Sequence, residues 1–309
     1  MSHLQLPVVI TPTRAELGAR CHRRHFLSDN LGKARYFSAS LEFGSVCHSG
    51  AGAHWLQKDW REALQVEWAK RFELNSRASQ EKVSLALAEG MLGYYVEHSQ
   101  LAGPFTDQGD WKLVDVEQRF EVPLRDFKLS FQCDRMAYNE AEDWLVIVDL
   151  KTAARLDYRW ERQFETSLQM KLYKGAAKTV FQASRVDVVV EGLLKDIPSN
   201  IRYYVCPDWS DLMLAEAAHN AHTIAAMDAE VIVAGSDVIH NIMTPGEKKL
   251  ILNQDKVEQL AVTATPVNYM DCFSYGIECP FRRICVADVP ERVSILRGEY
   301  FDKLDDEDY

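Results

Sequence analysis

The chain has 309 residues, of which 47% are hydrophobic and 26% charged, so it has the composition of a globular protein with a substantial core. No apolar run approaches the roughly 18 residues of a membrane-spanning helix, and the N-terminal segment lacks the pattern of a signal peptide, so we expect a cytoplasmic protein without a membrane anchor. The net charge of −11 argues against nucleic-acid binding by the surface as a whole. Basic residues are nevertheless clustered locally, and local charge decides where a phosphate backbone can lie.

The first third of the chain is predicted to be helical. We expect a helix over 11–27 with Thr11 or Thr13 as its cap, because both hydroxyls precede an apolar periodicity. A loop over 41–52 is expected to lead into a helix that reaches about residue 74. A further helix over 79–100 is expected to end before Gly103-Pro104.

The middle of the chain alternates between strand and helix patterns. The elements expected after residue 110 are, in order, strands over 112–123, 128–138 and 144–151, a helix over 160–181, strands over 186–194 and 201–205, a helix over 208–234 capped by Asp208, and a short helix within 236–265. The third strand contains the apolar run Leu145–Val148, which is typical of a strand buried on both faces. This order predicts an α/β fold in which a central mixed β-sheet is flanked by helices.

Charged residues appear at the end of the buried strand. Asp149 and Lys151 are two residues apart, so both side chains point to the same side, and Asp134 lies just before the preceding turn. Carboxylate oxygens bind Mg²⁺ or Mn²⁺, which polarise a phosphate and activate water, and a lysine offsets developing charge. The exposed backbone carbonyl of Leu150 is a further candidate ligand. The pattern favours metal-dependent phosphodiester hydrolysis, although a surface Asp–Lys pair remains the alternative.

Three further motifs accompany these residues in the right order. Gly44 and His48 form a G-x-x-x-H motif, Glu117 lies on the first expected strand, and Gln169 and Tyr173 form a Q-x-x-x-Y motif on the following helix. With Asp134, Asp149 and Lys151, they resemble the PD-(D/E)xK nuclease superfamily, specifically its RecB-like branch.

The resemblance implies a restriction-endonuclease-like core and a role for each residue. His48, Asp134, Asp149, the Leu150 carbonyl and Glu117 would hold the metal, and Lys151 would assist catalysis. Gln169 and Tyr173 would face the site. The alternatives are an exposed strand glutamate at 117, a helix with a buried Tyr173, and confusion of His48 with His54.

Three of the seven cysteines fall within fourteen residues near the C-terminus. The pattern Cys272-x6-Cys279-Pro-Phe-x3-Cys285 resembles the iron–sulfur segment of RecB-like exonucleases, which include the AddB subunit, the CRISPR-associated RecB-like nucleases and related phage proteins. Cys21 fits the place of their fourth ligand. The resemblance implies a [4Fe–4S] cluster that staples a helical cap, and four thiolates suit structural Zn²⁺ as well. The six residues after Cys272 depart from the usual two of the CRISPR-associated group.

The remaining cysteines, Cys47, Cys133 and Cys206, are expected to be buried apolar residues. The expected regions are an N-terminal helical region over 1–110 that carries Cys21 and His48, a nuclease core over 111–235, an iron–sulfur region over 236–301 and an acidic tail over 302–309.

The resemblance implies a DNA exonuclease that acts on single-stranded or frayed ends, with a 5′→3′ preference, in recombination, repair or phage DNA processing in a bacterial or phage-infected cytosol. Two alternatives are a DNA-end-binding adaptor of a helicase, integrase or packaging complex, with a protein partner at the acidic tail, and a structure-specific endonuclease. The residues expected to contact DNA are Arg23, Arg24, Arg155 and Lys174.

Overall fold

The structure is a computed structural model, and it describes residues 9–34, 39–73, 83–240, 248–268, 279–299 and 301–302. The chain divides into two compact units, each assembled from segments that are distant in sequence. The first comprises Met1–Tyr36, Pro123–Leu129 and Ala218–Tyr309, and the second comprises Phe37–Val122 and Ser130–Ala217. Of the helices described, none combines the length and apolar character needed to cross a membrane.

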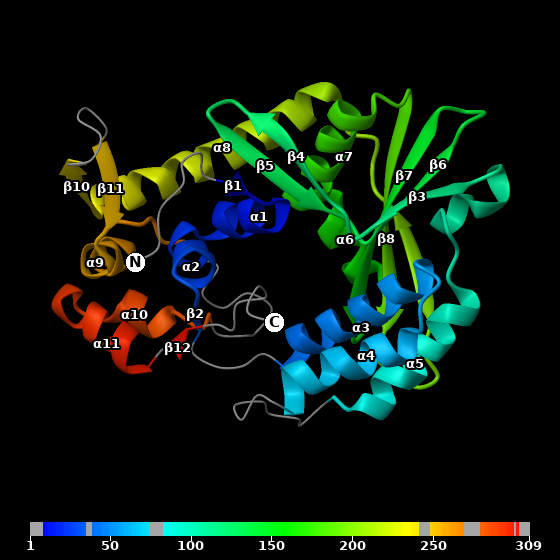
Figure 1. Cartoon of the computed structure of the whole chain (residues 1–309), viewed down its shortest axis with the longest axis horizontal. Coiled ribbons are helices and arrows are strands. Elements are labelled where there is room, and N and C mark those ends of the chain that lie inside the picture. The colour runs from blue at the N-terminus through cyan, green and yellow to red at the C-terminus, as the bar shows by residue number, and fades with distance from the viewer. Residues whose placement is uncertain are drawn as a thin grey trace. The chain divides into compact units, whose positions relative to one another are not determined.

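A mixed sheet organises the second unit (Figure 1). Its strands are β3 (Lys112–Val116), β6 (Arg135–Asn139), β7 (Trp144–Ala153), β8 (Arg185–Leu194) and β9 (Ile201–Val205). Among the described residues they lie in the order β3-β6-β7-β8-β9, with β7 and β8 parallel and the other neighbours antiparallel. The central strands read as apolar runs because both of their faces are covered.

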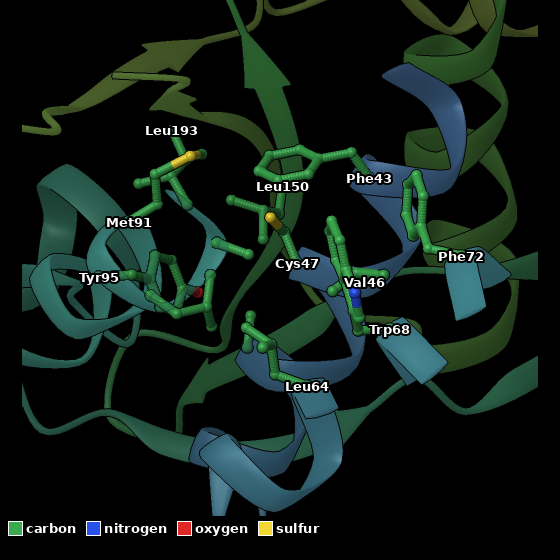
Figure 2. Close-up of a cluster of buried hydrophobic side chains, with 13 residues drawn as sticks. Phe43, Val46, Cys47, Leu64, Trp68, Phe72, Met91, Tyr95, Leu150 and Leu193 are labelled. Atoms are coloured by element: carbon green, nitrogen blue, oxygen red, sulfur yellow. The ribbon is translucent and has the colours of Figure 1, made fainter. Parts of the chain in front are cut away.

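Helices cover both faces of this sheet. The helical elements of the unit are α3 (Ala39–Trp55), α4 (Trp60–Trp68), η2 (Ala69–Glu73), α5 (Leu85–His98), η3 (Gly103–Gln108), α6 (Tyr158–Glu165) and α7 (Leu168–Phe181). Leu150 and Leu193 face α3, α4 and α5, and their side chains join one buried apolar cluster with those helices (Figure 2). On the opposite face, α6 approaches β8 closely at Gly192. A Cβ at that position would lie 2.5 Å from Leu156 and 2.7 Å from Trp160, so only glycine fits.

The first unit is built largely from helices at the two ends of the chain. Its elements are β1 (Val9–Ile10), α1 (Pro12–Arg20), α2 (His22–His25), η1 (Phe26–Asn30), β2 (Lys33–Ala34), β10 (Ser236–His240), β11 (Lys248–Leu252), α9 (Gln254–Thr263), α10 (Arg282–Val286), η5 (Val289–Glu291), α11 (Arg292–Glu299) and β12 (Phe301–Asp302). Phe26 and Leu27 pack with Val257, Ile284 and Leu296 in one buried cluster. Burial of apolar surface therefore joins the N-terminal and C-terminal segments of this unit.

Three elements pass from one unit into the other. They are β4 (Arg119–Leu124), β5 (Phe127–Gln132) and α8 (Asp211–Ala234). Within the described chain, β5 lies between β1 and β4 in a small sheet, where it is parallel to β1. The pairs β10–β11 and β2–β12 are antiparallel.

Several local predictions are confirmed. Thr11 caps α1, since its side chain accepts a hydrogen bond from the N–H of Arg14. The run that precedes Asp149 is the buried strand β7, and Cys47, Cys133 and Cys206 are all buried. The α/β fold with a central mixed sheet flanked by helices is likewise observed.

The predicted loop over 41–52 is wrong, because these residues belong to α3. Within this helix Gly50 allows close packing, because a Cβ there would lie 2.8 Å from Leu92 of α5. The predicted single helix over 160–181 is also wrong. It breaks after α6, and the Ser167 side chain caps α7 by accepting a hydrogen bond from the N–H of Met170.

Three other predictions miss a boundary or an element. The two strands expected over 112–123 and 128–138 are four, because the chain turns after β3 and again after β5. Asp208 does not cap α8, which begins at Asp211; the carboxylate instead lies 2.6 Å from the ammonium of Lys174. The segment 236–265 contains the antiparallel hairpin β10–β11 before the helix α9, and its sequence includes Val238, Ile239 and Ile251, residue types that favour strands.

Candidate metal centre

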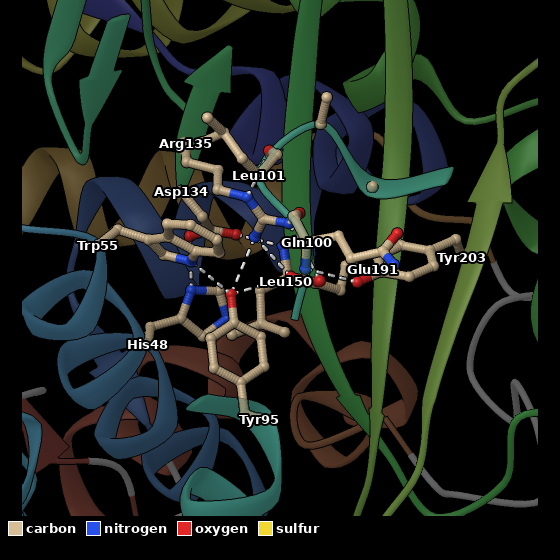
Figure 3. A network of polar contacts seen from close by, with 12 residues as sticks. His48, Trp55, Tyr95, Gln100, Leu101, Asp134, Arg135, Leu150, Glu191 and Tyr203 are labelled. Carbon is tan, nitrogen blue, oxygen red and sulfur yellow. Dashed lines mark hydrogen bonds and ion pairs between the residues drawn. The ribbon is translucent and has the colours of Figure 1, made fainter. Parts of the chain in front are cut away.

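Asp134 lies immediately before β6, and its carboxylate joins two other elements. Its Oδ1 lies 2.6 Å from Nδ1 of His48, which projects from α3 (Figure 3). Its Oδ2 accepts a hydrogen bond from the N–H of Leu150 in β7. The two contacts fix the orientation of the carboxylate, because each oxygen has its own partner.

Glu117 brings a second carboxylate to the same place. Its side chain and those of His48 and Asp134 offer ligand atoms that all lie within 4.8 Å of one another. Gln132 orients the glutamate by donating a hydrogen bond of 2.7 Å to its Oε2. Glu117 lies in the bend just beyond β3, rather than on the strand as predicted, and its φ of 57° is a left-handed conformation that is rare outside glycine.

Asp149 and Lys151 point to the same side of β7, as their spacing predicts. The ammonium of Lys151 lies 2.8 Å from Oδ2 of Asp149, and the side chains are 32% and 3% exposed respectively. Although this oxygen is ion-paired, it is buried and accepts no hydrogen bond of good geometry within the described chain. A buried carboxylate oxygen whose described partner is the Lys151 ammonium can also accept a metal cation.

The electrostatics of the site follow from several charges gathered in a buried space. Burial raises the pKa of Asp149, and the Asp134 carboxylate raises it further, against the opposing effect of Lys151. Burial and the charge of Asp134 likewise raise the pKa of Glu117 to about 7. Burial would raise the pKa of Asp134 too, but His48 and Lys151 outweigh it and lower that pKa. Burial opposes protonation of His48, yet Asp134 raises its pKa.

These donors fit a hard divalent cation. Carboxylate oxygens with one imidazole are ligands that Mg²⁺ and Mn²⁺ accept. Two of the carboxyl groups have raised pKa values because they are buried near Asp134, and a cation would remove that repulsion.

Gln169 and Tyr173 lie one turn apart on α7, and the Gln169 amide donates a hydrogen bond of 2.9 Å to the Tyr173 hydroxyl. Tyr173 is buried. Burial and the nearby Asp149 raise the pKa of this phenol well above its usual value, so the hydroxyl stays protonated. The motif therefore contributes neutral polar groups beside the carboxylates.

The four predicted DNA contacts differ in accessibility. Arg155 is exposed and Arg24 is partly exposed, so both stay predictions. Arg23 is buried and donates hydrogen bonds to the side chain and carbonyl of Thr265. Lys174 is buried beside Asp208. Arg23 and Lys174 thus have partners within the chain, Thr265 for Arg23 and the exposed Asp208 for Lys174, and their contact with a phosphate backbone stays a prediction.

The predicted cluster ligands lie in the first unit. Cys21, Cys279 and Cys285 are buried there, and Cys272 falls outside the described residues. In the part of the chain that the structure describes, these three cysteines do not bring their sulfur atoms together as a group within 4.8 Å, as His48, Glu117 and Asp134 do with their ligand atoms. The cluster therefore stays a prediction.

Sequence reasoning missed a buried ion pair next to the site. Arg135 follows Asp134, and its guanidinium pairs with Glu191 of β8 at 2.5 Å. The signal was present, because each charge interrupts a buried strand and such charges need a partner. Their pairing across a third strand could not be read from the sequence.

Comparison with known proteins adds a family. The sequence model of the PD-(D/E)XK nuclease superfamily matches residues 9–286 of the chain. Similar solved structures include a candidate exonuclease from Eubacterium rectale, with a TM-score of 0.49 and 16% identity over 87% of this chain and 94% of that one. They also include SSO0001, with a TM-score of 0.36 and 14% identity over 73% of this chain and 79% of that one. Neither likeness is close enough to define a function. No curated protein matches the chain.

Proposed function

Since this chain belongs to the PD-(D/E)XK nuclease superfamily, we propose that it is a DNA exonuclease whose divalent cation is held by His48, Asp134 and Asp149. Glu117 and the backbone carbonyl of Leu150 complete the proposed ligand set. The observation that carries the proposal is the convergence of His48, Glu117 and Asp134 within 4.8 Å, beside the ion pair of Asp149 and Lys151. The sequence distance between these residues makes an accidental cluster a poor explanation.

The bound Mg²⁺ or Mn²⁺ supplies Lewis-acid chemistry, because it polarises a phosphate and lowers the pKa of water. The side chains of the protein position the water and the metal ligands and offset the negative charge on the phosphate. Lys151 is partly exposed beside Asp149, where its ammonium orients the attacking water and offsets the negative charge that develops on the phosphate. Asp134 is held at both oxygens, so its ligand position is set before substrate arrives.

Gln169 and Tyr173 on α7 are proposed to position the phosphate of the substrate. The hydrogen bond from Gln169 to Tyr173 holds the amide beside the Tyr173 hydroxyl, whose pKa is raised in part by the nearby Asp149. From there the amide contacts the phosphate next to the scissile bond, and Arg155 and Arg24 contribute positive charge for the DNA backbone.

The proposed substrate is a single-stranded or frayed DNA end, cleaved with 5′→3′ polarity during recombination, repair or phage DNA processing. Linear and circular single strands separate the two nuclease classes, because an exonuclease leaves the circle intact. Substrates labelled at the 5′ or the 3′ end then report the polarity. Cleavage of the circle would favour a structure-specific endonuclease instead.

The site assignment is tested with Asp149→Ala and Lys151→Ala on labelled single-stranded DNA with Mg²⁺ or Mn²⁺. Both variants should lose activity by roughly 100-fold or more. Lys112→Ala is a matched control, because Lys112 is an exposed strand lysine paired with Glu140. Undiminished cleavage by both site variants would overturn the assignment.

We also propose that Cys21, Cys272, Cys279 and Cys285 hold a [4Fe–4S] cluster. Two contacts support it: the Asn268 side chain donates a hydrogen bond to the carbonyl of Arg20, and the N–H of Arg23 donates one to the carbonyl of Pro266. Residues 266 and 268 of the C-terminal segment therefore lie beside Cys21.

Iron, acid-labile sulfide and zinc are measured on anaerobically purified protein to test the cluster. Four irons and four sulfides per chain are expected for the cluster, and they should be lost in Cys21→Ala but kept in Cys206→Ala. Stoichiometric zinc without iron would replace the cluster with a structural zinc site.

A second candidate function follows from the net charge of −11, to which the residues of the tail over 302–309 contribute. An acidic surface favours a protein partner over DNA, as in a DNA-end-binding adaptor of a larger machine. Deleting the tail should then abolish a co-purifying complex while leaving nuclease activity intact. Retention of the complex would exclude the tail as the contact.

A further inference from the structure

A buried ion pair crosses the strand that carries Asp149 and Lys151. Arg135 extends from β6 and Glu191 from β8, and β7 lies between these two strands in the sheet. The two side chains are 1% and 0% exposed, and both nitrogens at the end of the guanidinium contact the carboxylate, at 2.5 and 3.0 Å. Such a bidentate contact fixes both partners in one geometry.

The guanidinium of Arg135 has an acceptor for each of its five N–H donors. Besides the two contacts with Glu191, its Nε donates to the carbonyl of Leu101 at 3.0 Å, its Nη2 to the carbonyl of Gln100 at 2.7 Å, and its Nη1 to the Tyr95 hydroxyl at 2.9 Å (Figure 3). The arginine therefore joins two strands, α5 and the segment that follows α5.

The same network reaches the helix that carries His48. The Tyr95 hydroxyl accepts a hydrogen bond of 2.8 Å from Nε1 of Trp55 and donates one of 3.0 Å to Glu191. The Trp55 ring also lies 4.7 Å from the guanidinium of Arg135. Trp55 follows His48 by seven residues, which is two turns along α3. The network thus fixes α3 against the sheet close to the imidazole.

Strand register connects the network to the other side of the site. Glu191 is the cross-strand neighbour of Leu150, whose N–H holds Asp134. Arg135 is the residue after Asp134 in the chain. One set of contacts therefore supports the backbone on both sides of the Asp134 carboxylate and, through Trp55, the helix of His48.

We propose that Arg135, Glu191, Tyr95 and Trp55 form a positioning network that sets the separation of His48 and Asp134 and thereby the affinity of the metal site. None of the four is proposed to touch substrate or metal. Replacing a buried ion pair with apolar residues is often neutral or stabilising, so global stability does not explain the network. Metal centres, in contrast, depend on ligand positions held to within about 0.5 Å. The inference rests on the proposed metal-dependent function.

The experiment compares the full-length protein with the double variant Arg135→Met/Glu191→Leu, which keeps side-chain volume and removes both charges. Mn²⁺ affinity is measured by titration without DNA, and kcat, KM and the melting temperature of the metal-free protein are measured separately. We expect a melting temperature equal to or above that of the wild type, a Kd for Mn²⁺ raised by roughly 10- to 100-fold, and a kcat lowered while KM changes little.

Two further variants keep the proposal falsifiable. Tyr95→Phe retains the ring and removes only the hydroxyl contacts, so a smaller rise in the Mn²⁺ Kd is expected, and this variant carries the test if the double variant does not fold. Arg185→Met/Asp187→Leu is the matched control, because it removes an ion pair of 2.7 Å from the other end of β8. It should lower the melting temperature, because Trp144 loses its hydrogen bond of 2.9 Å to Asp187, and it should leave the Mn²⁺ Kd unchanged.

The outcomes separate the network from the proposed reaction. Wild-type Mn²⁺ affinity and kcat in a folded double variant would overturn the positioning role. A wild type that binds Mn²⁺ but cleaves no DNA would overturn the nuclease proposal alone, while a weakened Kd in the variants would still support the network. A wild type that binds no Mn²⁺ would overturn both.

Discussion

Both units of the molecule contain a histidine hydrogen-bonded to an aspartate, and the two arrangements differ in what surrounds them. In the second unit, His48 lies 2.6 Å from Asp134, and their side chains are 28% and 17% exposed. In the first unit, His25 lies 2.8 Å from Asp228, and their side chains are 0% and 3% exposed. The separations are similar, but of these two pairs only His48 and Asp134 are open to solvent and ligands.

The partners of each carboxylate explain the difference. The two oxygens of Asp228 each contact one imidazole, from His22 and from His25, and His25 contacts Asp29 as well. Asp134 instead has Glu117 and Asp149 nearby, so negative charge is in excess. The carboxylate of Asp228 is thus satisfied by two imidazoles, whereas further carboxylates gather beside Asp134, where the cation is proposed to bind.

The largest expected effect comes from Asp134→Asn. The amide keeps an acceptor for the N–H of Leu150 but removes the ligand charge, so DNA cleavage should fall on the order of 1000-fold. Initial rates on linear single-stranded DNA at saturating Mn²⁺ measure this. Wild-type rates would show that Asp134 is not part of the active site.

Asp228→Asn should have the opposite profile. It removes the more deeply buried of the two carboxylates that contact His25, so the free energy of unfolding should fall by about 3 kcal/mol, as measured by urea denaturation. Cleavage by the folded fraction should be unchanged. A large loss of cleavage at wild-type stability would give Asp228 a role in the reaction.

The pH dependence of stability sharpens the comparison further. Burial of His25 opposes its protonation, but hydrogen bonds to Asp228 and Asp29 outweigh burial and raise its pKa to about 9. Its contribution to stability is therefore complete below the unfolded pKa of about 6.5 and is lost as pH rises through 9. Between about pH 6 and pH 9 the wild type should lose about 2.5 kcal/mol more than His25→Gln. Parallel profiles for the two proteins would contradict the raised pKa.

Asp228 determines part of the loss of stability expected at low pH. Burial would raise its pKa, but hydrogen bonds from His22 and His25 outweigh it and lower that pKa to about 2. The contribution of this carboxylate is therefore present above its unfolded pKa of about 3.9 and is lost as pH falls toward 2.

The smallest effect expected is stabilisation by the metal. A cation that binds only the folded protein adds about 1.4 kcal/mol to the free energy of unfolding at ten times its Kd. Mn²⁺ should therefore raise the melting temperature of the wild type and of Asp228→Asn, but not that of Asp134→Asn. An equal shift in all three proteins would place the cation elsewhere.

The sequence predicted those parts of the site that depend on local spacing. The alternation of β7 was enough to place Asp149 and Lys151 together, and the turn spacing of α7 was enough to pair Gln169 with Tyr173. The motif order also anticipated the approach of His48 to Asp134, although these residues are 86 positions apart.

The missed features depend on tertiary contacts. Nothing local distinguishes an arginine that reaches across a strand to Glu191 from one that faces solvent. The segment 41–52 is a helix and not the predicted loop, and its close packing at Gly50 depends on Leu92 of another helix. Arg23 and Lys174 looked like surface cations because their partners, Thr265 and Asp208, follow much later in the chain. The metal-ligand roles and the region boundaries stay predictions.

The left-handed backbone at Glu117 sets folding stability against the proposed metal binding at a single residue. Glycine would relieve a conformation that costs a residue with a side chain on the order of 1 kcal/mol, yet it would remove a carboxylate from the site. Selection for stability alone would drive this position toward glycine. Glu117→Gly is therefore expected to raise the free energy of unfolding by on the order of 1 kcal/mol while it removes one carboxylate from the proposed cation site.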